Sequence, residues 1–61
     1  MNKYIFNCDF LDGVISHIAA YDITIISMVR DGLNYIVQLE NPIPPDEFIH
    51  LKDGYGLRES I

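Results

Sequence analysis

Cys8 and His17 are the pair of side chains in this 61-residue sequence that comes closest to a nucleophilic site. If the first 20 residues form two strands paired through a tight turn, the thiol and the imidazole lie opposite each other. A thiol beside an imidazole is the usual arrangement of an activated cysteine nucleophile. Such a site also needs a third group that orients the imidazole, and Asp9 and Asp12 point elsewhere in this register. We therefore expect a packed cysteine, a half-buried histidine and no enzymatic activity.

The sequence contains no recognisable metal or cofactor motif. Cys8, His17 and His50 could meet at a metal ion, but their spacing matches no known set of ligands. The glycine-rich stretch at 54–56 differs from a phosphate-binding loop, because no lysine follows it. We expect neither a metal nor a cofactor.

The element that organises the chain is a hairpin around Asp31-Gly32, which separates two runs rich in Ile, Val, Leu and Tyr. Asp-Gly between apolar runs is typical of a tight β-hairpin, because the turn residues take positive φ. The sequence predicts strands over 23–30 and 33–40, with this dipeptide as the two-residue loop.

Both faces of the predicted hairpin are apolar. Ile23, Ile25, Val29 and Ile36 cluster on the second face, whereas the outer face of a one-sided antiparallel sheet is normally polar. We predict that these four residues form an interface with another part of the chain, a partner or a second copy. Tyr55, between two glycines, is predicted as a further interface residue, because tyrosine is enriched at interfaces.

Residues 14–20 permit two interpretations. Their β-branched side chains, and Gly13 close to a possible helix start, favour a strand. Helical spacing of Leu11 and Ile15 favours the alternative, a helix at about 10–21 between the first strand and the hairpin. We prefer the strand, which makes residues 3–20 a second hairpin.

The last third of the chain begins with three prolines between 42 and 45, which cannot lie in a central strand. Proline followed by two acids predicts a single helical turn near 45–48. A short last strand over 48–51, a glycine-rich turn at 53–56 and a flexible tail at about 57–61 complete the prediction.

Four strands, a proline-rich stretch with one helical turn and a short fifth strand resemble the element order of SH3-like small barrels. The PIPPDEFI stretch is similar to the segment before their last strand. The resemblance implies a mainly β fold: a small antiparallel sheet or SH3-like barrel of about five short strands. SH3 domains bind polyproline between aromatic residues that include a tryptophan. This chain has no tryptophan, so no ligand site is carried over.

Length and composition limit the function classes. A single domain of 61 residues, 1–61, is small enough to need disulfides, a metal or oligomerisation for stability. Cys8 is the one cysteine and the chain is 49% apolar, so we expect self-association. Nine acids against four scattered bases give a net charge of −5, which argues against direct nucleic-acid binding. With no signal peptide or membrane span expected, the lone cysteine predicts a cytoplasmic protein.

These features predict a small acidic protein-interaction module without enzymatic activity. Small acidic proteins often inhibit or regulate a partner, including viral proteins directed against host factors. We expect this role through docking on a partner protein or through homo-oligomerisation. The alternative is an oligomeric protein that binds a small anionic or nucleotide-like ligand in pockets between protomers. Arg30, Lys52, Arg58, Tyr55 and the two histidines would then contact the ligand.

Overall fold

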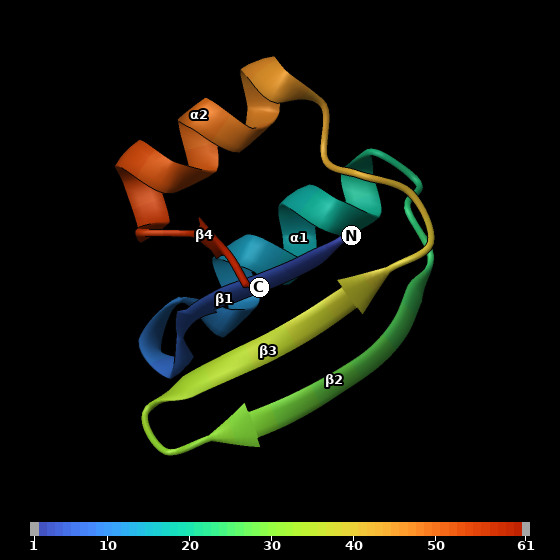
Figure 1. Ribbon diagram of the computed structural model, residues 1–61. Coiled ribbons are helices and arrows are strands. Elements are labelled where there is room, and N and C mark those ends of the chain that lie inside the picture. Colours follow the sequence, from blue (N-terminus) through green and yellow to red (C-terminus); the bar gives the residue numbers. More distant parts are fainter. Residues whose placement is uncertain (1, 61) are drawn as a thin grey trace.

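The computed structural model describes residues 2–60, which form an antiparallel sheet of four strands with two α-helices (Figure 1). The elements are β1 (Lys3–Asn7), a 3-10 turn η1 (Cys8–Phe10), α1 (Leu11–Ala20), β2 (Ile25–Asp31), β3 (Asn34–Leu39), α2 (Pro45–Tyr55) and β4 (Arg58–Glu59). The strand order across the sheet is β2-β3-β1-β4. Element order and strand order together correspond to the ferredoxin-like βαββαβ arrangement, in which β3 lies between β1 and β2.

The prediction of a mainly β fold or SH3-like barrel is wrong. The sheet is open, with β2 and β4 at its edges, and the structure is α+β. Residues 14–20 belong to α1, so the alternative of a helix at about 10–21 describes this segment. β-branched residues cost a helix at most about 0.7 kcal/mol each relative to alanine. Burial of Val14 and Ile18 in the core outweighs that cost.

The structure explains why a glycine, which disfavours a helix, occupies position 13 of α1. A Cβ atom at Gly13 would lie 2.7 Å from Cε1 of Tyr55. The Tyr55 ring, at the end of α2, therefore packs directly on the backbone of α1. The glycine weakens α1 by about 1 kcal/mol in helix propensity, and it allows this close contact between the helices.

α2 is much longer than the single turn predicted at 45–48. Its start agrees with the prediction, since it has proline at the first helical positions and two acids in its first turn. The strand predicted over 48–51 is wrong, because these residues continue the helix. Leu51 is buried in the core, and the Phe48 ring lies 5.9 Å from that of Tyr4 on β1. These contacts with the sheet stabilise the added turns.

The segment at 57–61, expected as a flexible tail, has ordered structure over its described part. Leu57 is fully buried, and β4 pairs antiparallel with β1. The amide of Ser60 donates to the carbonyl oxygen of Lys3 at 2.8 Å. Residue 61 lies outside the described residues. A buried leucine two residues after the end of α2 thus directs the chain back onto the sheet.

The predicted hairpin is confirmed, with its loop one residue further along. Asp31 faces Asn34, so Gly32 and Leu33 form the loop. Gly32 has φ 62 and occupies the first central position, where a type II′ turn requires glycine. From Ser27 to Asp31 the pairing differs from the predicted register by two residues, which keeps these side chains on their predicted faces. A bulge between Ile25 and Ser27 interrupts the ladder and pairs Ile25 with Leu39 of the core, so Ile25 does not keep its predicted face.

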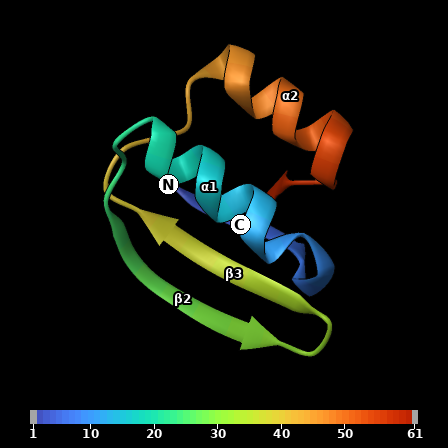
Figure 2. The same cartoon turned by 180° about the vertical axis from the view of Figure 1, so that it is seen from behind.

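The core lies between the helices and one face of β1 and β3. Its buried members are Tyr4, Phe6, Val14, Ile18, Val37, Leu39, Ile43, Leu51 and Leu57. β2 contributes none of these residues, and all seven of its residues are exposed. Figures 1 and 2 show β2 at the edge of the sheet far from α2.

Candidate functional site

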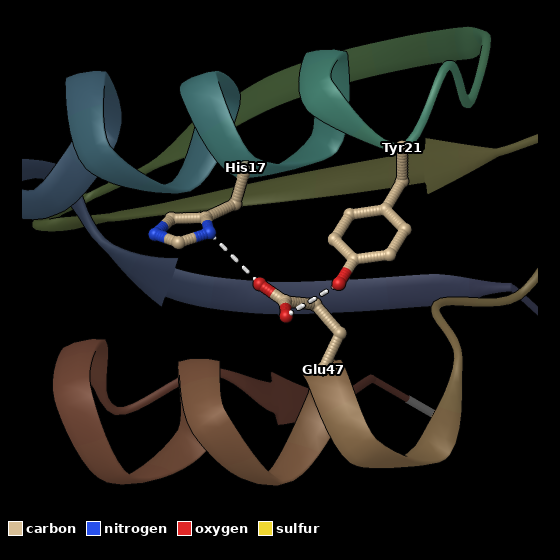
Figure 3. Close-up of polar contacts among 3 residues, drawn as sticks. All are labelled: His17, Tyr21 and Glu47. Atoms are coloured by element: carbon tan, nitrogen blue, oxygen red, sulfur yellow. Dashed lines mark hydrogen bonds and ion pairs between the residues drawn. The ribbon is translucent and has the colours of Figure 1, made fainter.

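The structure does not bring Cys8 and His17 together as a nucleophilic pair. Cys8 lies in η1, where its Sγ is 3.8 Å from Nη2 of Arg30 on β2. His17 lies on α1 and faces α2 (Figure 3). Within residues 2–60, no group of three or more His, Cys, Asp and Glu side chains could hold a metal ion. The strand pairing that would have joined the thiol and the imidazole is absent because residues 11–20 are helical.

A polar cluster links the two helices instead. His17 and Tyr21 lie one turn apart at the end of α1, and both approach Glu47 in the first turn of α2 (Figure 3). Nδ1 of His17 lies 2.8 Å from Oε1 of Glu47. The Tyr21 hydroxyl donates a hydrogen bond of 3.0 Å to Oε2. Both carboxylate oxygens of Glu47 therefore contact α1.

The two oxygens of Glu47 are satisfied to different degrees. Oε2 accepts the Tyr21 hydrogen bond, whereas the buried Oε1 accepts no hydrogen bond of good geometry. The 2.8 Å separation from Nδ1 of His17 still gives strong attraction when the imidazole is protonated.

The same carboxylate changes the acidity of the phenol. The hydrogen bond to Glu47 raises the pKa of Tyr21 above its ordinary value, because phenolate would lose this bond. The negative charges of Glu47 and then of Asp46 act in the same direction. Tyr21 therefore remains a neutral donor. The His17 ring also packs against the rings of His50 and Tyr55, at 5.8 and 5.7 Å. The cluster is a contact between the two helices.

The most exposed apolar surface lies on β2 and the adjoining loop. Among the described residues, five of the eight exposed large apolar side chains come from positions 25–33. They are Ile25, Ile26, Met28, Val29 and Leu33. This concentration on one edge is unusual, because single exposed apolar residues are normally scattered.

Two of the predicted interface residues are neighbours on the open face of the sheet. Val29 on β2 faces Ile36 on β3, which faces Ile5 on β1. Val29 is 59% exposed, and the other two are half-buried. Ile5 was not predicted as part of this row. The alternation of Tyr4, Ile5 and Phe6 could have indicated it, since Ile5 must point away from its two buried neighbours.

The remaining predicted interface residues lie elsewhere. Ile23 packs against the core, and Ile25 is exposed beside the bulge. Tyr55 is half-buried between the helices, with its ring 5.7 Å from that of Phe10. Val29, Ile36 and Ile5 are the three residues of the open-face row.

A separate apolar groove of about 480 Å³ lies beside the start of α2. It is lined by Tyr4, Pro42, Ile43, Pro44, Pro45, Phe48, Ile49 and Glu59. The Tyr4 hydroxyl accepts a hydrogen bond of 3.0 Å from the amide of Ile43, which holds one wall in place. Glu59 is the one charged residue among those that line the groove.

The cations predicted to contact an anionic ligand do not gather at one site. Arg30 lies on β2 and Arg58 on β4, at opposite edges of the sheet, whereas Lys52 lies on α2. Nε of Arg30 donates to the Gly32 carbonyl at 3.0 Å, and its guanidinium lies 5.7 Å from the centre of the Tyr35 ring. Arg30 thus stabilises the hairpin loop.

No family model, curated protein or solved structure significantly matches this chain. Neither helix in residues 2–60 has both the length and the apolar character needed to cross a membrane. The edge strand, the open-face row and the groove are therefore the features that can indicate a function.

Proposed function

We propose that this protein is a non-enzymatic protein-association module that accepts a further β-strand at the free edge of β2. The observation that carries the proposal is the composition of this edge. β2 has seven residues, all exposed, and carries no charge before Arg30. Natural edge strands are usually protected by charges, prolines, bulges or short length. In β2 such features lie at the two ends, as the bulge between Ile25 and Ser27 and the charges of Arg30 and Asp31, and leave the middle of the strand unprotected.

The opposite edge of the same sheet has the expected protection. β4 is two residues long, and both residues, Arg58 and Glu59, are charged. A short charged strand offers little backbone to a second chain. The contrast between the two edges supports β2 as the edge that is open to a partner.

The backbone groups available at the free edge can be identified from the hairpin. Asp31 faces Asn34 across the loop, and a two-residue hairpin loop closes on a hydrogen-bonded pair. Hydrogen-bonded positions alternate along an antiparallel ladder. Val29 therefore bonds to β3, whereas Met28 and Arg30 direct their N–H and C=O groups outward. An added strand would bond to these two residues.

Strand addition provides a mechanism for inhibition or regulation. Backbone hydrogen bonds supply affinity in this mode, and alternate side chains supply specificity. A partner whose own edge strand is held by β2 can no longer pair with anything else. The module needs no catalytic group for this effect.

Proline substitutions at adjacent positions test the proposal. Met28→Pro removes an N–H that only an added strand would use, and proline is tolerated at such outward positions of edge strands. Val29→Pro is the matched control, because it removes a bond to β3 and should disrupt the hairpin. We expect Met28→Pro to keep the wild-type circular dichroism spectrum and to lose association in native mass spectrometry. Association that persists in folded Met28→Pro would overturn the proposal.

Binding of a small ligand is a second candidate function, supported by the apolar groove. Its volume of about 480 Å³ lies in the usual range for ligand sites, which are mostly apolar with few polar groups. The groove lies within one protomer, and Glu59 at its rim favours a ligand with a cationic end over an anionic or nucleotide-like one. Octylamine should shift the NMR signals of Phe48 and Ile49 more than octanoate does. Equal or absent shifts would contradict this candidate.

A further inference from the structure

We propose that the strand added at β2 is β2 of a second copy, paired antiparallel about a two-fold axis at Val29. This inference rests on the proposed function, and it specifies both the partner and the register. The result is one continuous eight-stranded sheet made from two chains.

The free backbone groups of β2 are arranged symmetrically about Val29. Met28 and Arg30 are the residues that direct N–H and C=O groups outward, and Val29 lies between them. When Val29 faces Val29 of the second copy, Met28 faces Arg30 in both halves of the pair. Each such pair exchanges two hydrogen bonds, so every outward group of these residues finds a partner.

The charges of β2 favour the same register. A two-fold axis at Arg30 would place two guanidinium groups opposite each other. An axis at Asp31 would place two carboxylates opposite each other. Both arrangements are unfavourable, because like charges directly opposite destabilise a sheet. An axis at Met28 would pair Arg30 with the bulged position near Ile26. An axis at Val29 uses the regular part of the strand and places Asp31 opposite Ser27, whose hydroxyl can donate to the carboxylate.

The apolar surface also becomes continuous in this register. The open-face row of one copy, Ile5–Ile36–Val29, would meet Val29 of the second copy and continue through its Ile36 and Ile5. Val29, which is 59% exposed in the single chain, would pack against Val29 of the second copy. The pair of Val29 and Ile36 thus becomes the centre of a shared apolar surface.

One short strand buries less than the approximately 800 Å² per partner of a standard stable interface. We therefore expect a reversible dimer whose population rises with protein concentration. Sedimentation velocity over a range of concentrations measures this dependence on the full chain.

Disulfide trapping tests the register. Residues that face each other at a non-hydrogen-bonded position have Cα atoms about 4.5 Å apart, at the near end of the disulfide range of roughly 4.4–6.8 Å. In a Cys8→Ser background, Val29→Cys should form a covalent dimer in a glutathione redox buffer. Leu33→Cys is the matched control, because Leu33 is more exposed than Val29, at 70% against 59%, but lies away from the axis. We expect at least about tenfold faster linkage at position 29.

Four results would contradict the inference in whole or in part. If Leu33→Cys links as fast as Val29→Cys, random collision explains the linkage. If the chain remains monomeric at every concentration, a second copy is not the partner. A dimer that Met28→Pro abolishes but Val29→Cys does not trap would refute the register alone. A dimer that also survives Met28→Pro would refute the proposed function as well.

Discussion

β1 and β2 belong to one sheet and have similar apolar content, yet their surroundings are opposite. β1, with the sequence KYIFN, alternates between half-buried and buried residues. β2, with the sequence IISMVRD, is exposed throughout. The apolar content of a strand therefore does not determine its burial.

Position in the sheet accounts for the difference. β1 pairs with β3 on one side and β4 on the other, and its residues Tyr4 and Phe6 lie beneath the helices. β2 pairs only with β3 and lies at the edge (Figure 2). Its exposed apolar residues are consequently available to another chain. The following predictions test this contrast, in order of decreasing effect on folding stability.

The largest effect is expected from truncation of β1. Phe6 is fully buried, and Phe→Ala in a core typically costs about 3–5 kcal/mol. The total free energy of unfolding of a domain this size is roughly 3–9 kcal/mol, so Phe6→Ala should lose at least about a third of it. Val29→Ala on β2 should change stability by less than about 0.5 kcal/mol when the chain is monomeric. Urea titrations that gave similar losses for both variants would contradict the contrast.

A smaller effect is expected where the helices touch. A Cβ at Gly13 would meet the Tyr55 ring at 2.7 Å. Overpacking of this kind costs about 1–3 kcal/mol. Gly13→Ala should therefore lower the melting temperature despite its better helix propensity. The control is Gly54→Ala on α2, where a Cβ would meet nothing within 4 Å. That variant should be neutral or up to about 1 kcal/mol more stable. A stabilised Gly13→Ala would show that the Tyr55 ring moves aside at little cost.

Two exposed isoleucines distinguish the β2 edge from the rest of the surface. Ile26 on β2 and Ile49 on α2 are both 58% exposed. Replacement of either by lysine should change monomer stability by less than about 0.5 kcal/mol. Ile26→Lys should weaken association, because lysine protects an edge strand, whereas Ile49→Lys should leave it unchanged. Equal effects in sedimentation would indicate nonspecific apolar contact.

The smallest effect concerns the link between the helices. The pKa of Tyr21 is raised by Glu47, so the folded state favours the neutral phenol. Its stabilising contribution is fully present below the unfolded-state pKa of about 10 and is lost as pH rises through the folded-state pKa. In Glu47→Gln the pKa of Tyr21 should fall toward its ordinary value. Ultraviolet titration, with Tyr21→Phe to assign the transition among four tyrosines, measures this change.

Local chemistry made part of the fold predictable. Asp31-Gly32 between apolar runs predicts the hairpin, and proline followed by two acids predicts the start of α2. The clustering of Val29 and Ile36 on one face follows from the period of a strand. These features depend on neighbouring residues, so their geometry is encoded within a few positions of the chain.

The sequence by itself determined the hairpin, the beginning of α2 and the shared face of Val29 and Ile36. Only the tertiary structure decided that residues 11–20 are helical, that α2 extends to Tyr55 and that β4 pairs with β1. It also separated Cys8 from His17 and left β2 at an uncovered edge. The physical reason is that turns and helix starts depend on local backbone preferences of about 1 kcal/mol or less per residue. Burial against distant elements is worth more for each large apolar side chain, about 1.5–3 kcal/mol, and it overrides them.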